Sequence, residues 1–167
     1  MKNVYLVGFM GAGKTVVGRV LADKINKEFI EMDDIIEADE GRSIVDIFAQ
    51  QGEAYFRRCE KKLLNDLSAR EDLIIGCGGG LVCDPENLEI LRDTGLVFCL
   101  KVSALTAYGR TRHQAHRPIL NVDNPLRIIE ELLSKRAPCY DQAHYSIDTD
   151  GISPDAVADE IIDILNK

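Results

Sequence analysis

The stretch Gly8-Phe9-Met10-Gly11-Ala12-Gly13-Lys14-Thr15 decides the fold of this chain. It matches the pattern GxxxxGK(S/T) at every fixed position, and it lies between an apolar run at residues 4–7 and a helical pattern at residues 14–25. Glycines in such a turn let backbone N–H groups point at a phosphate, and the following helix presents its positive end to the same anion. We expect Lys14 to reach the β- and γ-phosphates of a nucleotide and the Thr15 hydroxyl to ligate Mg²⁺. The alternative interpretation is a plain glycine-rich turn.

Strands and helices alternate along the rest of the chain. Short apolar segments predict strands at residues 4–7, 29–30, 73–75, 97–102 and 145–147. Helices are predicted at residues 14–25, 43–51, 53–70, from Pro85 onward, and at 103–110, 126–136 and 154–165. This alternation predicts an α/β fold in which helices cover both faces of a parallel sheet. Because 167 residues suit one core, we expect a single domain, residues 1–167.

Net charge, apolar stretches and cysteine content limit the kinds of partner and the cellular compartment that this protein can have. The formal charge is −8 and the pI is near 4.9, which disfavours binding to nucleic acid or to an anionic membrane. No apolar stretch approaches the length of a membrane span. The five cysteines form no CxxC pair and are odd in number, which indicates a reducing compartment rather than a disulfide framework or a zinc site. We therefore expect a cytoplasmic protein.

Several carboxylates directly follow the second predicted strand. Glu31, Asp33 and Asp34 would lie at the carboxyl edge of the sheet, where ligands bind in open α/β folds. A carboxylate there can hold Mg²⁺ through water or accept the proton of an attacking hydroxyl. The alternative is that these residues are a solvated, acidic start of a helix.

Arg57, on the helix predicted at 53–70, can bind a substrate carboxylate with two parallel hydrogen bonds. Its alternative is an ordinary surface pair with Glu53 or Glu60. We expect this helix to bury Phe56, Cys59, Leu63 and Leu67.

Glycines and further arginines complete the candidate site. Three consecutive glycines at 78–80 are costly to order, which makes sense if a ligand approaches the backbone closely, although a flexible turn is the alternative. Residues 111–124 are polar and rich in Arg and His, and we expect an exposed loop that acts as a lid. An arginine carried by this lid could neutralise charge on the γ-phosphate, whereas the alternative is a basic surface loop. The arginines considered are Arg110, Arg112, Arg117 and Arg136.

Together these motifs resemble the shikimate kinases, over residues 4 to about 149. The resemblance rests on the order and spacing of several short segments rather than on the phosphate loop alone. They are the phosphate loop, Asp33 after Phe-Ile-Glu-Met, Gly41-Arg42-Ser43-Ile44, Gly52-Glu53, Phe56-Arg57, Glu60, the triple glycine, Arg117-Pro118-Ile119-Leu120 and Arg136-Ala137-Pro138-Cys139-Tyr140.

The resemblance implies a fold like the nucleoside monophosphate kinases, with a five-stranded parallel sheet. It implies transfer of the γ-phosphate of ATP, with Mg²⁺, to the 3-hydroxyl of shikimate in aromatic amino-acid biosynthesis. By similarity Asp33 contacts the reacting hydroxyl, Arg57 and Arg136 hold the carboxylate, and Gly79 approaches the ring. Arg117 reaches the phosphates from the lid and acts in catalysis with Asp33 and Lys14, while Arg110 lies against adenine. The expected ATP-binding loop residues are Gly11, Ala12, Gly13, Lys14, Thr15 and Val16. We expect a monomer.

Two positions depart from the family pattern. Glu31 stands where the family usually has Asp, which moves the carboxylate by roughly 1.5 Å, and Gly76-Cys77 stands where small or hydroxyl side chains are more usual. Two other functions are possible on these residues. One is a related kinase for another small acceptor, such as a gluconate kinase-like or nucleotide kinase-like enzyme. The other is a silent nucleotide-binding regulator, which would be expected to have lost Asp33, Lys14 or a lid arginine.

Overall fold

A five-stranded parallel sheet forms the centre of the molecule. The computed structural model describes residues 1–114 and 121–167. Its strands are β1 (Asn3–Val7), β2 (Glu28–Glu31), β3 (Leu73–Gly76), β4 (Gly95–Lys101) and β5 (Tyr145–Asp148). They lie in the order β2-β3-β1-β4-β5, and every neighbouring pair is parallel. The predicted fold class is confirmed, and each predicted strand is present with bounds shifted by at most two residues.

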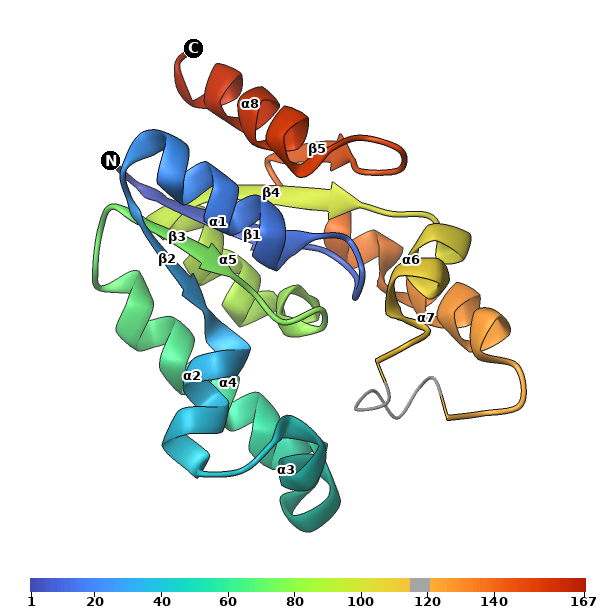
Figure 1. Ribbon diagram of the computed structural model, residues 1–167. Helices are drawn as coiled ribbons and strands as arrows, with labels where there is room; N and C mark the ends of the chain where they lie inside the picture. Colours follow the sequence, from blue (N-terminus) through green and yellow to red (C-terminus); the bar gives the residue numbers. More distant parts are fainter. Residues whose placement is uncertain (115–120) are drawn as a thin grey trace.

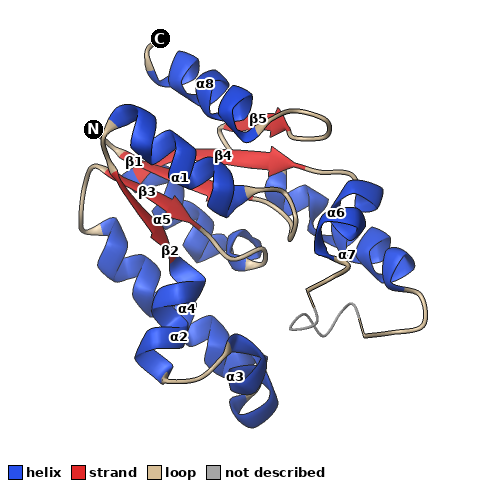
Figure 2. Cartoon of the chain, viewed as in Figure 1, coloured by secondary structure: helices blue, strands red, loops and turns tan. Residues whose placement is uncertain are grey.

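Helices cover both faces of this sheet, as Figures 1 and 2 show. On one face, α1 (Lys14–Ile25) and α8 (Pro154–Leu165) pack together over Val4 and Leu6 of the central strand. On the other face, Tyr5 and Val7 meet α4 (Glu53–Ser68), α5 (Pro85–Thr94) and α7 (Pro125–Tyr140). Successive residues of a strand point to opposite faces, so the apolar residues 4–7 of β1 supply both layers of the core. A further helix, α6 (Ala104–Thr111), follows β4.

Two short helices extend the molecule beyond the end of β2 (Figure 1). These are α2 (Met32–Glu40) and α3 (Ile44–Gln51), which pack with α4 around Ile36, Ile47 and Phe56. The side chain of Ser43, the first residue of the helix predicted at 43–51, accepts a hydrogen bond from the amide of Asp46 and caps α3. The sequence offered α2 only as an alternative interpretation of its acidic residues. A 3-10 turn, η1 (Leu81–Cys83), was not predicted.

Helix α4 buries a face that differs from the predicted one. Phe56 and Leu67 are buried as expected, but Glu60 and Leu64 are buried in place of Cys59 and Leu63, which are only partly buried. The carboxylate of Glu60 is paired with Arg57, and this pairing makes burial of a charged side chain tolerable. A prediction based on apolar residues alone therefore misplaced the stripe by one residue.

Helix α7 is longer at both ends than the pattern at 126–136 predicted. It starts at Pro125, a favourable first position, and continues through Pro138 to Tyr140. Proline usually ends a helix before it, but here the last turn places Tyr140 in the core with 6% of its surface exposed. Within the described residues, none of the helices combines the length and the apolar character needed to cross a membrane.

Candidate active site

The phosphate loop connects β1 to α1 in a backbone conformation that requires glycine. Gly8 has a φ of +141°, and a Cβ there would lie 2.4 Å from the carbonyl oxygen of Leu100. Gly13 has a φ of +91° and is the residue that precedes α1, so the first amides of the helix face the loop. The ammonium group of Lys14 donates to the carbonyl oxygens of Gly8 and Phe9, at 2.8 and 3.0 Å. The loop is therefore closed around the lysine that the sequence assigned to the phosphates.

Thr15 and Glu31 meet at the start of α1. The Thr15 hydroxyl donates a hydrogen bond of 2.6 Å to Oε2 of Glu31, the last residue of β2. Burial raises the pKa of the Glu31 carboxyl above its ordinary value, and the hydrogen bond from Thr15 opposes this shift. The two residues that the sequence assigned to a metal thus place their oxygens side by side. Among the described residues, no group of three His, Cys, Asp or Glu side chains could hold a metal ion.

The triple glycine is the point on which the other site residues converge. A Cβ at Gly78 would lie 2.5 Å from Oε1 of Glu60 and 3.4 Å from Oδ1 of Asp33. One at Gly79 would lie 3.1 Å from Nη1 of Arg136, and one at Gly80 would lie 2.5 Å from Nη2 of Arg57. Side chains from α2, α4 and α7 therefore come into contact distance of one short loop after β3. Any larger residue in this loop would displace them.

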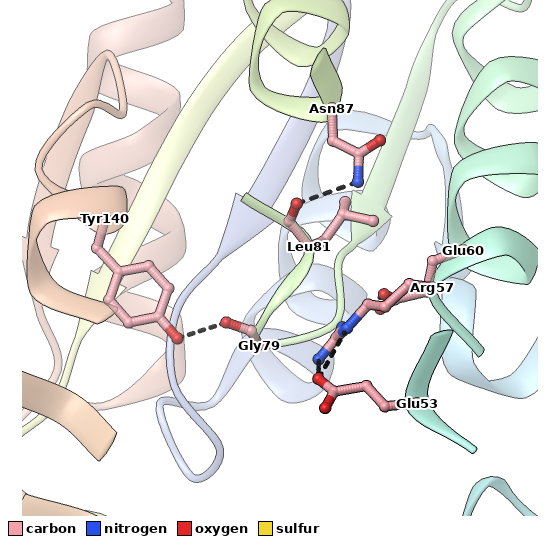
Figure 3. Close-up of polar contacts among 7 residues, drawn as sticks. All are labelled: Glu53, Arg57, Glu60, Gly79, Leu81, Asn87 and Tyr140. Atoms are coloured by element: carbon pink, nitrogen blue, oxygen red, sulfur yellow. Dashed lines mark hydrogen bonds and ion pairs between the residues drawn. The ribbon is translucent and has the colours of Figure 1, made fainter. Parts of the chain in front are cut away.

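Arg57 is held on α4 by two carboxylates. Its guanidinium pairs with Glu60 at 2.6 Å and with Glu53 at 3.2 Å. Figure 3 shows the pair with Glu53. The alternative interpretation of Arg57 was therefore correct about its partners, but Glu60 is 1% exposed and is not a surface residue. Burial raises the pKa of Glu60 to about 7, against the opposing effect of Arg57. The pair fixes the guanidinium beside Gly80.

Glu60 and Tyr140 belong to the site although the sequence gave neither a functional role. The Tyr140 hydroxyl donates a hydrogen bond of 2.6 Å to the carbonyl oxygen of Gly79, from the side of the loop opposite Arg57 (Figure 3). The charge of Glu60 within a helical apolar stripe was the signal that could have identified it. For Tyr140 the signals were its place in the segment at residues 136–140 that carries the family resemblance and its spacing of four residues from Arg136, which places both on one face of α7.

Asn87 supports Leu81, the residue that follows the triple glycine. Its side chain is 3% exposed and donates a hydrogen bond of 3.2 Å to the carbonyl oxygen of Leu81 (Figure 3). The guanidinium of Arg136 also lies over the ring of Phe9 in the phosphate loop, with 5.8 Å between its central carbon and the ring centroid. The triple glycine and the phosphate loop are thus linked through α7.

Of the two remaining arginines predicted to bind ATP, Arg110 is described by the structure and Arg117 is not. Arg110, at the end of α6, donates to the carbonyl oxygens of Gly11 and Thr149, at 2.9 and 2.8 Å. It therefore borders the phosphate loop. Arg117 and part of the lid predicted at residues 111–124 lie outside the described residues, which omit residues 115–120.

The chain is similar to known proteins over nearly its whole length. The family model for shikimate kinase matches residues 10–166. A shikimate kinase of Thermodesulfovibrio yellowstonii is 41% identical over 162 residues, which cover 97% of this chain and 94% of that protein.

Solved structures agree with this result. A shikimate kinase of Acinetobacter baumannii, in complex with shikimate, superposes with a TM-score of 0.94 at 38% identity and covers 99% of this chain and 93% of that one. A gluconokinase of Sinorhizobium meliloti gives a TM-score of 0.55 at 16% identity over 99% of this chain and 95% of that one, which shows a shared fold alone. The match to the family model and the identity to known members over nearly the whole chain show that the chain belongs to the shikimate kinase family.

Proposed function

We propose that this chain transfers the γ-phosphate of ATP to the 3-hydroxyl of shikimate and so supplies shikimate 3-phosphate for the synthesis of chorismate and aromatic amino acids. Membership of the shikimate kinase family supports the reaction. The observation that carries it is the convergence of Asp33, Arg57 and Arg136 on the triple glycine after β3. Two guanidinium groups beside one loop suit an acceptor with a carboxylate, and a carboxylate beside the same loop suits a hydroxyl that must lose a proton.

The proposed roles follow from these contacts. Arg57 and Arg136 bind the shikimate carboxylate, and Gly79 leaves room for the ring. Asp33 orients the hydroxyl and accepts its proton. Residues 11–16 bind the phosphates of ATP, and Lys14 leaves its two loop carbonyls to stabilise the charge that develops on the γ-phosphate. Arg110 beside adenine and Arg117 at the phosphates stay predictions from the sequence.

We further propose that the metal ion of this site is Mg²⁺. Magnesium in nucleotide sites takes few ligands from the protein, with phosphates and waters completing its octahedron. The adjacent oxygens of Thr15 and Glu31 fit that demand, Thr15 as a ligand and Glu31 through a water. When bound, the ion neutralises charge on the β- and γ-phosphates. The protein's own contribution is to hold the hydroxyl and the carboxylate at the first turn of α1.

The remaining proposals concern the state of the protein. We propose one functional domain spanning residues 1–167, acting as a monomer in the cytoplasm. All five cysteines are free thiols, which supports a reducing compartment. The retention of Asp33 and Lys14 beside the loops that they serve argues against a silent regulator.

An acceptor panel tests the function and separates it from the related-kinase alternative. ADP release by the purified chain should depend on shikimate and remain at background with gluconate, with a nucleoside monophosphate, and with shikimate methyl ester, which lacks the carboxylate charge. Equal turnover with the methyl ester would contradict a site built around two arginines. Turnover with gluconate but not with shikimate would favour the related kinase.

A further inference from the structure

Glu31 and Gly76 lie opposite each other on neighbouring strands. In the parallel pairing of β2 and β3, Glu31 is the register partner of Gly76, and Gly76 is in turn the partner of Leu6 on β1. Residues in one such row point to the same face of a sheet. Leu6 faces the layer that holds α1, so Glu31 and any side chain at position 76 would point to that layer as well.

The carboxylate of Glu31 occupies the space that a side chain at position 76 would fill. A Cβ at Gly76 would lie 2.9 Å from Oε2 of Glu31 and 3.2 Å from both its Cδ and its Oε1. The same Oε2 accepts the hydrogen bond of 2.6 Å from Thr15. Gly76 does not have a positive φ, so its backbone does not require glycine. A glycine in a strand weakens the strand, so its presence needs a reason. At position 76 that reason is the space that glycine leaves for the Glu31 carboxylate.

We propose that Gly76 is a positioning residue for the metal site, because the absence of its Cβ allows the Glu31 carboxylate to rest beside the Thr15 hydroxyl. This inference rests on the magnesium site proposed above. It predicts that side-chain sizes at positions 31 and 76 compensate each other. A methyl group at 76 drives the longer carboxylate away from Thr15, whereas aspartate at 31 withdraws the carboxylate by roughly 1.5 Å and leaves room for the methyl group.

A double-mutant cycle tests this compensation. The variants are Gly76→Ala, Glu31→Asp and the double variant. Gly109→Ala in α6 is the matched control, because a Cβ there meets no atom of the described residues within 4 Å. Two quantities are measured without shikimate. The first is the gain in affinity that Mg²⁺ gives to binding of a non-hydrolysable ATP analogue, by calorimetry. The second is the melting temperature without metal or nucleotide.

We expect Gly76→Ala to reduce the Mg²⁺-dependent gain by about tenfold or more, the size typical of lost support around a metal. Adding Glu31→Asp should restore most of this loss and raise the melting temperature above that of Gly76→Ala, while Gly109→Ala should leave the gain unchanged. The inference is overturned if Gly76→Ala has no effect on either quantity, or if its effects simply add to those of Glu31→Asp.

Two further outcomes are also decisive. If Gly76→Ala does not fold, a folded double variant supports the inference, and an unfolded one shows that the clash is not with Glu31. If the wild type gains no affinity from Mg²⁺, the magnesium proposal fails. The melting temperatures of the three variants then decide the question alone. If Glu31→Asp restores the melting temperature that Gly76→Ala lowers, the positioning of Glu31 by Gly76 is supported. If the two effects simply add, it is overturned.

Discussion

Asp33 and Glu60 are two carboxylates that face the same glycine, Gly78, with different surroundings. Asp33 lies in the first turn of α2, where the helix dipole favours its negative charge. Glu60 is buried on α4 and is partnered by Arg57. Different environments for neighbouring carboxylates allow one to serve as a base while the other holds an arginine in place.

Asp33→Asn tests the proton-accepting role. The amide keeps the size and some hydrogen bonding of the side chain but cannot take a proton, so we expect phosphate transfer at saturation to slow by about 100-fold or more. The shikimate dissociation constant should rise much less. Single-turnover kinetics and equilibrium titration of the same protein separate the two quantities. Transfer at the wild-type rate once the variant is saturated would make Asp33 a binding residue only.

Glu60→Gln tests the buried ion pair through pH. The pKa of Glu60 is raised from an ordinary 4.5 to about 7 in the folded protein. The folded state therefore holds the proton more tightly than the unfolded state, and the stability that this gives below pH 4.5 is lost as pH rises through 7. Glutamine does not titrate. Relative to Glu60→Gln, the wild type should lose up to about 3 kcal/mol of unfolding free energy between pH 4.5 and pH 8.

Denaturant melts of both proteins across that pH range measure this difference. A constant difference would show that Glu60 titrates near its ordinary value and that its burial is relieved in solution.

At the scale of elements, the triple-glycine loop is held by two helices that the sheet places on either side of it. Arg57 approaches from α4, and Tyr140 approaches from α7 (Figure 3). The loop itself has no side chains with which to fix its shape. Its position therefore depends on hydrogen bonds such as that from Tyr140 to Gly79 and that from Asn87 to Leu81.

Tyr140→Phe removes one of these supports without changing the packing of the ring. The carbonyl of Gly79 is only half-buried, so losing this hydrogen bond costs about 0.5–1.5 kcal/mol, which lowers the melting temperature by about 1–6 °C in a domain of this size. Because Gly79 lies against the proposed acceptor site, shikimate affinity should fall while ATP affinity stays within about twofold. Tyr145→Phe on β5 is the control, since this residue is 40% exposed and its hydroxyl has no hydrogen bond among the described residues. Equal changes in the two variants would remove Tyr140 from the site.

Elements with a strong local pattern were predictable, and those fixed by tertiary contacts were not. The phosphate loop, α1 and α8 follow from glycine, lysine and apolar spacing within short windows. Helix α2 is short and acidic, and tertiary contacts support it, because Met32 is buried in the main core and Ile36 packs against Ile47 and Phe56. The last turn of α7 passes a proline because Tyr140 gains burial and a hydrogen bond.

In the candidate site, too, residues with a local sequence signal were predictable and residues placed by tertiary contacts were not. Lys14, Thr15 and Asp33 carry recognisable signals because their positions follow directly from a strand end. From the sequence, Glu60 is one of two candidate surface partners in the alternative interpretation of Arg57, since only the folded chain shows that its oxygen lies beside Gly78. The space that Glu31 takes at Gly76 is likewise a property of strand pairing, which the sequence alone does not reveal.

At the scale of the whole molecule, strand order brings distant segments to one edge. The order β2-β3-β1 makes neighbours of three carboxyl ends, and these carry Asp33, the triple glycine and the phosphate loop. Ligands of open α/β sheets bind at this edge. The chain has a net charge of −8, yet Lys14, Arg57 and Arg136 gather here. The fold thus provides an anion site within an acidic protein.

The most direct test of the account identifies the product. Purified chain, ATP, Mg²⁺ and shikimate are incubated, and the mixture is analysed by phosphorus and proton NMR beside a measurement of ADP. We predict one phosphate ester for each ADP formed, with the phosphate on the 3-hydroxyl. ADP without an ester, or an ester on another hydroxyl, would contradict the placement of Asp33 and the two arginines around the triple glycine.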